Sequence, residues 1–289
     1  MSNTRKACVV LAATLLAAAP LRAGAPSGVP SAEDAIRRAC DKVGGLDALG
    51  RLGIVEIESS SEEVTQDGHT SNWHMNLFFR SPGPLPGRVE MPEKNVVIGD
   101  DGHGGWAVIN ERADGRQTTS FMVRRSLNNY LFPILLPFSL AWEGVSVSDV
   151  TAATVNGKPV WRLSVTLPRT FFDTPQIATK WTVDVDAGTF GLVHAESPAT
   201  DLGKGVTADG MRFSWRGDVM LGGVHLPSEL HVVGLDQEGR EKTHSRTDHL
   251  KYRQLPATEA GRLFGNPIPS DQRPKPYKPQ LPAAPPPKS

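Results

Sequence analysis

Several side chains could take part in catalysis or metal binding. They fall into three local groups: Asp100, Asp101 and His103; His244, Asp248 and His249; and Cys40. Carboxylates and imidazoles could hold a divalent cation or transfer a proton, and a thiolate could act as a nucleophile. The sequence lacks the patterns of zinc proteases, serine hydrolases, nucleotide-binding loops and Cys-x-x-Cys redox sites. No recognised catalytic motif therefore supports any of these groups.

Each group also has a simpler structural interpretation. Adjacent carboxylates beside the glycine-rich run at 102–105 are typical of a solvated turn. His244 and His249 are an odd number of positions apart, so in a strand they point to opposite faces and cannot share a ligand. Cys40 lies on the apolar face of an expected helix, which predicts a buried thiol. A relay built from Ser214 or Ser245 has no supporting pattern. We therefore predict no metal site, no cofactor and no catalysis.

The stronger pattern is apolar. Aromatic and aliphatic side chains alternate with polar ones in several segments, as in antiparallel strands with one buried face. The predicted buried face carries Trp73, Met75, Leu77, Phe79, Trp161, Leu163, Val165, Trp181, Val183, Phe213 and Trp215. In the first of these segments, only Phe78 interrupts the polar face. A sheet that curls around an apolar face must fill the hollow with helices or with a ligand.

Turn sequences separate these segments. Dipeptides typical of tight hairpins stand at Asp67-Gly68, Asp114-Gly115, Asn156-Gly157, Ala187-Gly188, Asp209-Gly210, Gly222-Gly223 and Glu238-Gly239. They predict eight or more strands in meander order from Ile54 to about Leu255. Strand–helix–strand alternation is missing, which argues against a parallel nucleotide-binding sheet. The predicted fold is mainly β, with one antiparallel sheet that is curled or closed.

Two helices are expected near the N-terminus. Ser31 can cap a helix in which apolar residues recur at helical spacing from Ala32 to Val43, and Gly44-Gly45 ends it. Leu46, Leu49 and Leu52 then predict a short second helical piece.

The apolar segment 126–142 contains Pro133 and Pro137, which predict short helical turns and no unbroken helix. We place this segment on the concave face of the sheet, with Leu131, Ile134, Leu135 and Phe138 pointing into the hollow. It is either a plug that completes the core or a movable lid over a cavity.

The N-terminus has the features of a secretory signal peptide. Arg5 and Lys6 precede a 13-residue apolar run at 7–19, and Ala23-Gly24-Ala25 follows as a cleavage signal. The run is too short to span a bilayer, so we expect residues 1–25 to be removed and no transmembrane helix to remain. The expected location is the periplasm.

Two further features concern partners. The 31 basic and 31 acidic side chains balance, which argues against nucleic-acid binding. The stretch 266–289 holds nine of the 24 prolines and predicts a disordered tail, which could contact envelope proteins. This leaves 26–265 as a single folded domain.

Several turn motifs carry a family resemblance over roughly residues 32–255. They are Gly44-Gly45-Leu46-Asp47-Ala48-Leu49 before a strand, Asp101-Gly102 leading to Trp106, Asn156-Gly157-Lys158-Pro159-Val160, the hairpin from Asp184 to Gly188, and Gly223-Val224-His225-Leu226-Pro227. In these residues the chain resembles the LolA/LolB-like superfamily of outer-membrane lipoprotein-sorting proteins. The resemblance implies an unclosed barrel covered by helices and a hydrophobic cavity for acyl chains, and it does not imply an enzyme.

Taken together, the sequence predicts a periplasmic, non-catalytic protein that binds the acyl chains of lipids or lipoproteins. The expected ligand residues are those of the predicted buried face and of the segment 126–142 that covers it. The first alternative is a structural or interaction module of the cell envelope with a filled core. A less favoured alternative is an envelope hydrolase.

Overall fold

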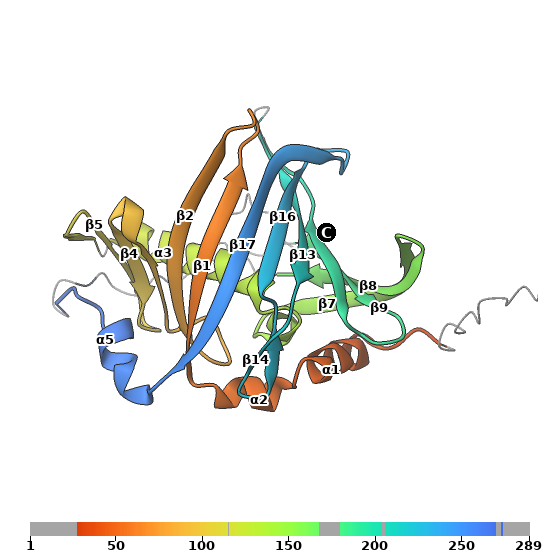
Figure 1. Cartoon of the computed structure of the whole chain (residues 1–289), viewed down its shortest axis with the longest axis horizontal. Coiled ribbons are helices and arrows are strands. Elements are labelled where there is room, and N and C mark those ends of the chain that lie inside the picture. The colour runs from red at the N-terminus through yellow and green to blue at the C-terminus, as the bar shows by residue number, and fades with distance from the viewer. Residues whose placement is uncertain (1–27, 115, 168–179, 204–205, 270–272, 274–289) are drawn as a thin grey trace, which may run out of the picture.

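The computed structural model describes residues 28–114, 116–167, 180–203, 206–269 and 273 (Figure 1). The predicted signal peptide and most of the predicted tail lie outside these residues. Within them, no helix combines the length and the apolar character that a membrane span requires.

The two N-terminal helices form where the sequence places them. In α1 (Ala32–Lys42), the hydroxyl of Ser31 accepts a hydrogen bond of 3.1 Å from the backbone N–H of Asp34 and so caps the first turn. Ala35 and Ala39 face the core. The second helix, α2 (Leu46–Arg51), follows directly after Gly44-Gly45.

Most strands join one antiparallel sheet. In the part of the chain that is described, its thirteen strands run in the order β6-β5-β4-β3-β2-β1-β17-β16-β13-β10-β9-β8-β7. Their bounds are β1 (Ile54–Val64), β2 (Thr70–Arg80), β3 (Gly87–Met91), β4 (Val96–Asp100), β5 (Gly105–Ile109), β6 (Arg112–Asp114), β7 (Ser146–Val155), β8 (Lys158–Thr166), β9 (Lys180–Asp186), β10 (Leu192–Ser197), β13 (Gly210–Arg216), β16 (Glu229–Leu235) and β17 (Glu241–Leu255). The sheet curls but is not closed, as predicted.

The described residues also form two small two-stranded sheets and three short 3-10 turns outside this sheet. The small sheets pair β11 (Thr200–Gly203) with β12 (Val206–Ala208) and β14 (Val219–Leu221) with β15 (Val224–Leu226), and the 3-10 turns are η1 (Pro92–Lys94), η2 (Phe138–Ala141) and η3 (Ala257–Glu259).

The chain path explains why a helix crosses the concave face. Strands β1 to β6 lead outward to one edge of the sheet, and β7, the next strand in sequence, forms the opposite edge. The connection is α3 (Gln117–Ile134) followed by η2, and 18 helical residues at 1.5 Å each span about 27 Å. Figure 1 shows α3 running across the sheet behind β2, β1 and β17.

This helix is longer than the sequence predicts. The expectation of short turns is wrong for the first part of 126–142, because α3 begins at Gln117 and continues to Ile134. The expected break is confirmed, because the helix ends before Pro137 and η2 follows as a separate turn. Pro133 lies one residue before the end of the helix, so the bond that its missing N–H cannot make is among the last of the hydrogen-bond ladder. Only η2, after Pro137, is the kind of short helical turn expected.

Five of the predicted hairpin turns are confirmed, at 67–68, 156–157, 187–188, 222–223 and 238–239. Two are not hairpins. Asp114 ends β6 and the chain then enters α3, while Asp209 stands between β12 and β13, which pair with other strands. The tight turn between β5 and β6 is instead made by Asn110 and Glu111, both with positive φ.

The outer face of the sheet carries a second, smaller core. Phe78, which interrupts the polar face of β2, is buried there with Ile54 against Leu263 and Phe264 of α5 (Ala260–Phe264). Ile268 is also buried, and Arg273 donates a hydrogen bond of 2.9 Å to its carbonyl. The first residues of the predicted tail therefore pack on the fold, because they include a large apolar side chain.

Candidate functional site

The structure gathers the predicted acyl-chain residues into one apolar cluster. The sheet side of the cluster contains Met75, Leu77, Phe79, Trp161, Leu163, Val165, Trp181, Val183 and Phe213, with Trp73 and Trp215 packed against it. The helical side contains Leu131, Ile134, Leu135 and Phe138. We call these two sets the floor and the cover. The parity of the strands thus identified a real face, while its role toward a ligand remains a proposal.

The helix α3, which carries most of the cover, touches the floor through specific aromatic and polar contacts. The ring centroid of Phe132 on α3 lies 5.1 Å from that of Trp181 in an edge-on arrangement, and Trp181 stacks on Phe213 at 5.0 Å. The indole N–H of Trp215 donates to the carbonyl of Pro133 at 2.8 Å. All four cover residues are at most 1% exposed. In this conformation the cover is closed over the floor.

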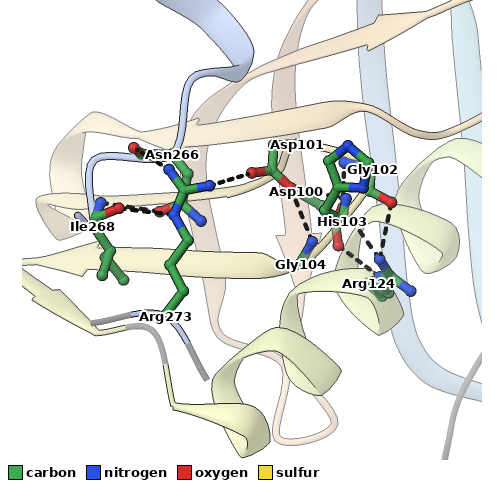
Figure 2. A network of polar contacts seen from close by, with 9 residues as sticks. All are labelled: Asp100, Asp101, Gly102, His103, Gly104, Arg124, Asn266, Ile268 and Arg273. Carbon is green, nitrogen blue, oxygen red and sulfur yellow. Dashed lines mark hydrogen bonds and ion pairs between the residues drawn. The ribbon is translucent and has the colours of Figure 1, made fainter. Parts of the chain in front are cut away.

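An ion pair ties α3 to the sheet (Figure 2). Asp100, at the end of β4, is completely buried, and its carboxylate accepts a hydrogen bond of 2.6 Å from Nε of Arg124 on α3. The same carboxylate accepts one of 2.7 Å from the backbone N–H of Gly102. A buried carboxylate requires such partners, so Arg124 fixes the first half of α3 against β4.

The glycine-rich run at 102–105 forms the predicted turn, between β4 and β5. Asp101 closes it by accepting hydrogen bonds of 2.8 and 2.9 Å from the N–H groups of His103 and Gly104. Its other oxygen lies 3.3 Å from Arg273, so the loop is held by Arg124 on one side and by Arg273 on the other (Figure 2). Among the described residues, no group of three or more His, Cys, Asp or Glu side chains is arranged to hold a metal ion.

One end of the concave face is polar, which the sequence reasoning missed. Ser61 on β1 donates a hydrogen bond of 2.6 Å to the buried carboxylate of Asp248 on β17. Nε of Arg246 lies 3.0 Å from the same carboxylate, and Nε2 of His244 lies 2.9 Å from Glu63. The signal was available, because all these residues have the strand parity of the buried apolar positions.

His244 and His249 point to opposite faces of the sheet, as predicted. His244 contacts Glu63 on the concave side, while His249 is exposed and lies 3.7 Å from Glu229. They cannot act on one ligand.

The convex side carries another buried carboxylate. Asp184 on β9 is completely buried and receives two hydrogen bonds of 2.8 Å from Arg162 on β8. Nε2 of His194 on β10 lies 3.1 Å from it. This carboxylate is held by an ion pair that joins three neighbouring strands.

A surface groove of about 800 Å³ lies where α1 and α2 meet η2 and β7. Its lining includes Ile36 and Cys40 from α1, Ala141 and Val147. Cys40 itself is 1% exposed, and burial, with a smaller contribution from Asp41, raises the pKa of its thiol to about 12. The thiol therefore stays protonated at neutral pH.

We expect Cys40 to be chemically inert in the folded protein. The thiolate is the reactive form, so alkylation by iodoacetamide at pH 8 should be slower than in urea by about two orders of magnitude. The measurement uses a Cys8→Ser variant, in which Cys40 is the only thiol. Labelling of the native protein at the rate seen in urea would place the thiol in water and contradict the packing of α1.

The comparisons with known proteins concern the fold. No family model matches the sequence, and no curated protein matches it. Among solved structures, a LolA superfamily protein from Nitrosomonas europaea is 10% identical, with a TM-score of 0.51 over 78% of this chain and 96% of that one. A protein domain from Vibrio parahaemolyticus, described as outer-membrane lipoprotein-sorting, is 11% identical, with a TM-score of 0.49 over 79% and 95%. The chain thus has the LolA-like fold, an unclosed antiparallel sheet with a helix across its concave face.

Proposed function

We propose that this protein binds acyl chains of lipids or lipoproteins in the periplasm, between the floor and the cover, without catalysing a reaction. The observation that carries the proposal is the nature of the closure. In the described part of the chain, helices cover an apolar face of at least eleven residues: α3 and η2 supply the cover, α1 and α2 join the same cluster, and no second large sheet packs on it. The fold shared with a LolA superfamily protein fits this function.

Binding of this kind would exchange the contacts between floor and cover for contacts between floor and ligand. Each methylene group that leaves water contributes about 0.8 kcal/mol. When the cover moves away, the floor loses contacts with Leu131, Leu135 and Phe138, and an acyl chain replaces them. The apolar area buried by the cover and the area buried by the ligand are similar. The free-energy cost of moving the cover is therefore offset only if the ligand fills the floor well.

The alternative is an interaction module of the cell envelope with a permanently filled core. The complete burial of the cover side chains favours it, since a fully packed interior needs no ligand for its stability. The two functions differ in one measurable property, which is saturable binding of an apolar ligand.

We expect the dye N-phenyl-1-naphthylamine to bind saturably, to quench emission from the floor tryptophans, and to be displaced by palmitate. A filled core would give neither effect. A double variant, Asp100→Asn with Arg124→Gln, removes the attraction that holds α3 on β4 and leaves no unpaired buried charge. It should take up the dye several-fold faster than the parent protein.

The matched control is Glu259→Gln with Arg262→Gln. This pair, at 2.7 Å, joins η3 to α5 and involves neither α3 nor a strand of the sheet. Its uptake rate should equal that of the parent protein. Equal rates in all three proteins, or no saturable binding by the parent, would argue for the filled core.

A further inference from the structure

We infer that the polar end of the concave face recognises a head group rich in acceptor oxygens, through Ser59 and Trp73. The inference rests on the proposed function. It assigns the apolar part of the floor to the acyl chain and the polar end to the ester or phosphate that the chain carries.

The concave face changes character along its central strands. On β1, the inward positions Val55 and Ile57 are followed by Ser59, Ser61 and Glu63. On β17, the register pairs Leu250 with Ser59, Asp248 with Ser61 and Arg246 with Glu63. The same face is thus apolar at one end and polar at the other, which is the pattern that an amphiphile in a fixed orientation requires.

Two polar atoms at this end have no partner within the described part of the chain. They are the hydroxyl of Ser59, a residue with 0% exposure, and the indole N–H of Trp73. Folded proteins leave few buried polar atoms unsatisfied, and each such atom calls for an explanation. Trp73 stands directly opposite Ser61 on β2, and Met75 stands opposite Ser59, so Ser59 and Trp73 are diagonal neighbours on one face.

The neighbouring groups restrict what the ligand can be. An indole N–H can only donate, so its partner must be an acceptor. The guanidinium carbon of Arg246 lies 5.7 Å, and the ammonium nitrogen of Lys94 5.6 Å, from the centre of the Trp73 ring. Two cations beside the donor favour oxygen acceptors and disfavour a cationic head group. The carboxylate of Asp248 binds Ser61 and Arg246 and does not accept a hydrogen bond from the indole N–H of Trp73.

The decisive variant is Ser59→Ala, because it removes no hydrogen bond of the protein itself. We expect its melting temperature to equal or exceed that of the parent. Its affinity for 1-palmitoyl-lysophosphatidylglycerol should fall about tenfold, the loss of one hydrogen bond to an ionised head group. Its affinity for N-phenyl-1-naphthylamine, which has no oxygen, should not change.

Two further proteins complete the experiment. Trp73→Phe keeps an aromatic ring but has no N–H. Its affinity for the lipid, divided by its affinity for the dye, should therefore be lower than in the parent protein. Ser61→Ala is the control: it breaks the hydrogen bond to Asp248, so it should lower the melting temperature. Monopalmitoylglycerol distinguishes the source of the oxygens. If its affinity falls with that of the phospholipid, the ester is recognised, and if only the phospholipid is affected, the phosphate is.

Failure takes two distinguishable forms. If the parent protein binds both lipids and the dye, and Ser59→Ala either changes none of the affinities or lowers all three equally, the head-group site is wrong and the acyl-chain function stands. If the parent protein binds neither the lipids nor the dye, the proposed function itself fails and takes the head-group site with it.

Discussion

Replacing Leu135 by Glu is expected to lower the free energy of unfolding by more than about 3 kcal/mol. Leu135 stands at the end of α3 with 0% exposure, inside the cluster that joins floor and cover. The substitution removes its apolar contacts and places an unpaired carboxylate among apolar side chains. Urea unfolding followed by circular dichroism measures the change.

Met122 provides the matched control, because it lies on the same helix and is 63% exposed. Met122→Glu introduces the same charge into water, so its effect should stay within about 0.5 kcal/mol. A comparable loss of stability in both variants would show that α3 does not tolerate an added acidic residue at any position, and the burial of Leu135 would not be the cause.

The size of the Leu135→Glu effect also bears on function. A protein can hydrate a misplaced carboxylate by lifting the cover, so the destabilisation cannot exceed the free energy of opening. A small decrease in stability together with lost dye binding would mean that the cover opens readily in water. A large decrease means that the closed state dominates and that a ligand must displace tightly packed side chains.

The strand pattern predicted the buried face of the sheet more completely than the helices that cover it. Alternation in a strand has a period of two, so a few residues such as Trp161, Leu163 and Val165 suffice to identify the buried face. The cluster confirms every one of these positions. The start of the sheet at Ile54 and its end at Leu255 also agree with the prediction.

What the sequence could not provide depends on contacts between distant segments. Phe78 breaks the alternation because α5, far away in the sequence, covers the outer face at that point. The early start of α3 at Gln117 was not predicted, because no apolar stripe at helical spacing marks this part of the sequence. The insertion of β17 between β1 and β16, which places Asp248 opposite Ser61, is a property of the sheet topology and cannot be read from either strand alone.

Gly44→Ala is the second substitution with a large expected effect, and it tests how the N-terminal helices are held. Gly44 has a φ of +112°, and a Cβ atom at this position would lie 2.2 Å from the carbonyl oxygen of Gly223. The backbone of the β14–β15 hairpin therefore approaches the end of α1 as closely as a glycine allows. Next to this contact, the N–H of His225 donates to the carbonyl of Val43 at 2.9 Å.

A methyl group at Gly44 must push the hairpin away from the helix. The expected result is a loss of more than about 3 kcal/mol, because the conformational penalty of about 1–2 kcal/mol is joined by the lost packing and hydrogen bond. Gly45→Ala separates these contributions. Gly45 also has a positive φ, +84°, but its added Cβ would meet nothing closer than 3.8 Å. It should therefore lose only about 1–2 kcal/mol. If the two alanine variants unfold at the same urea concentration, the close approach of Gly44 to Gly223 does not hold α1 in place.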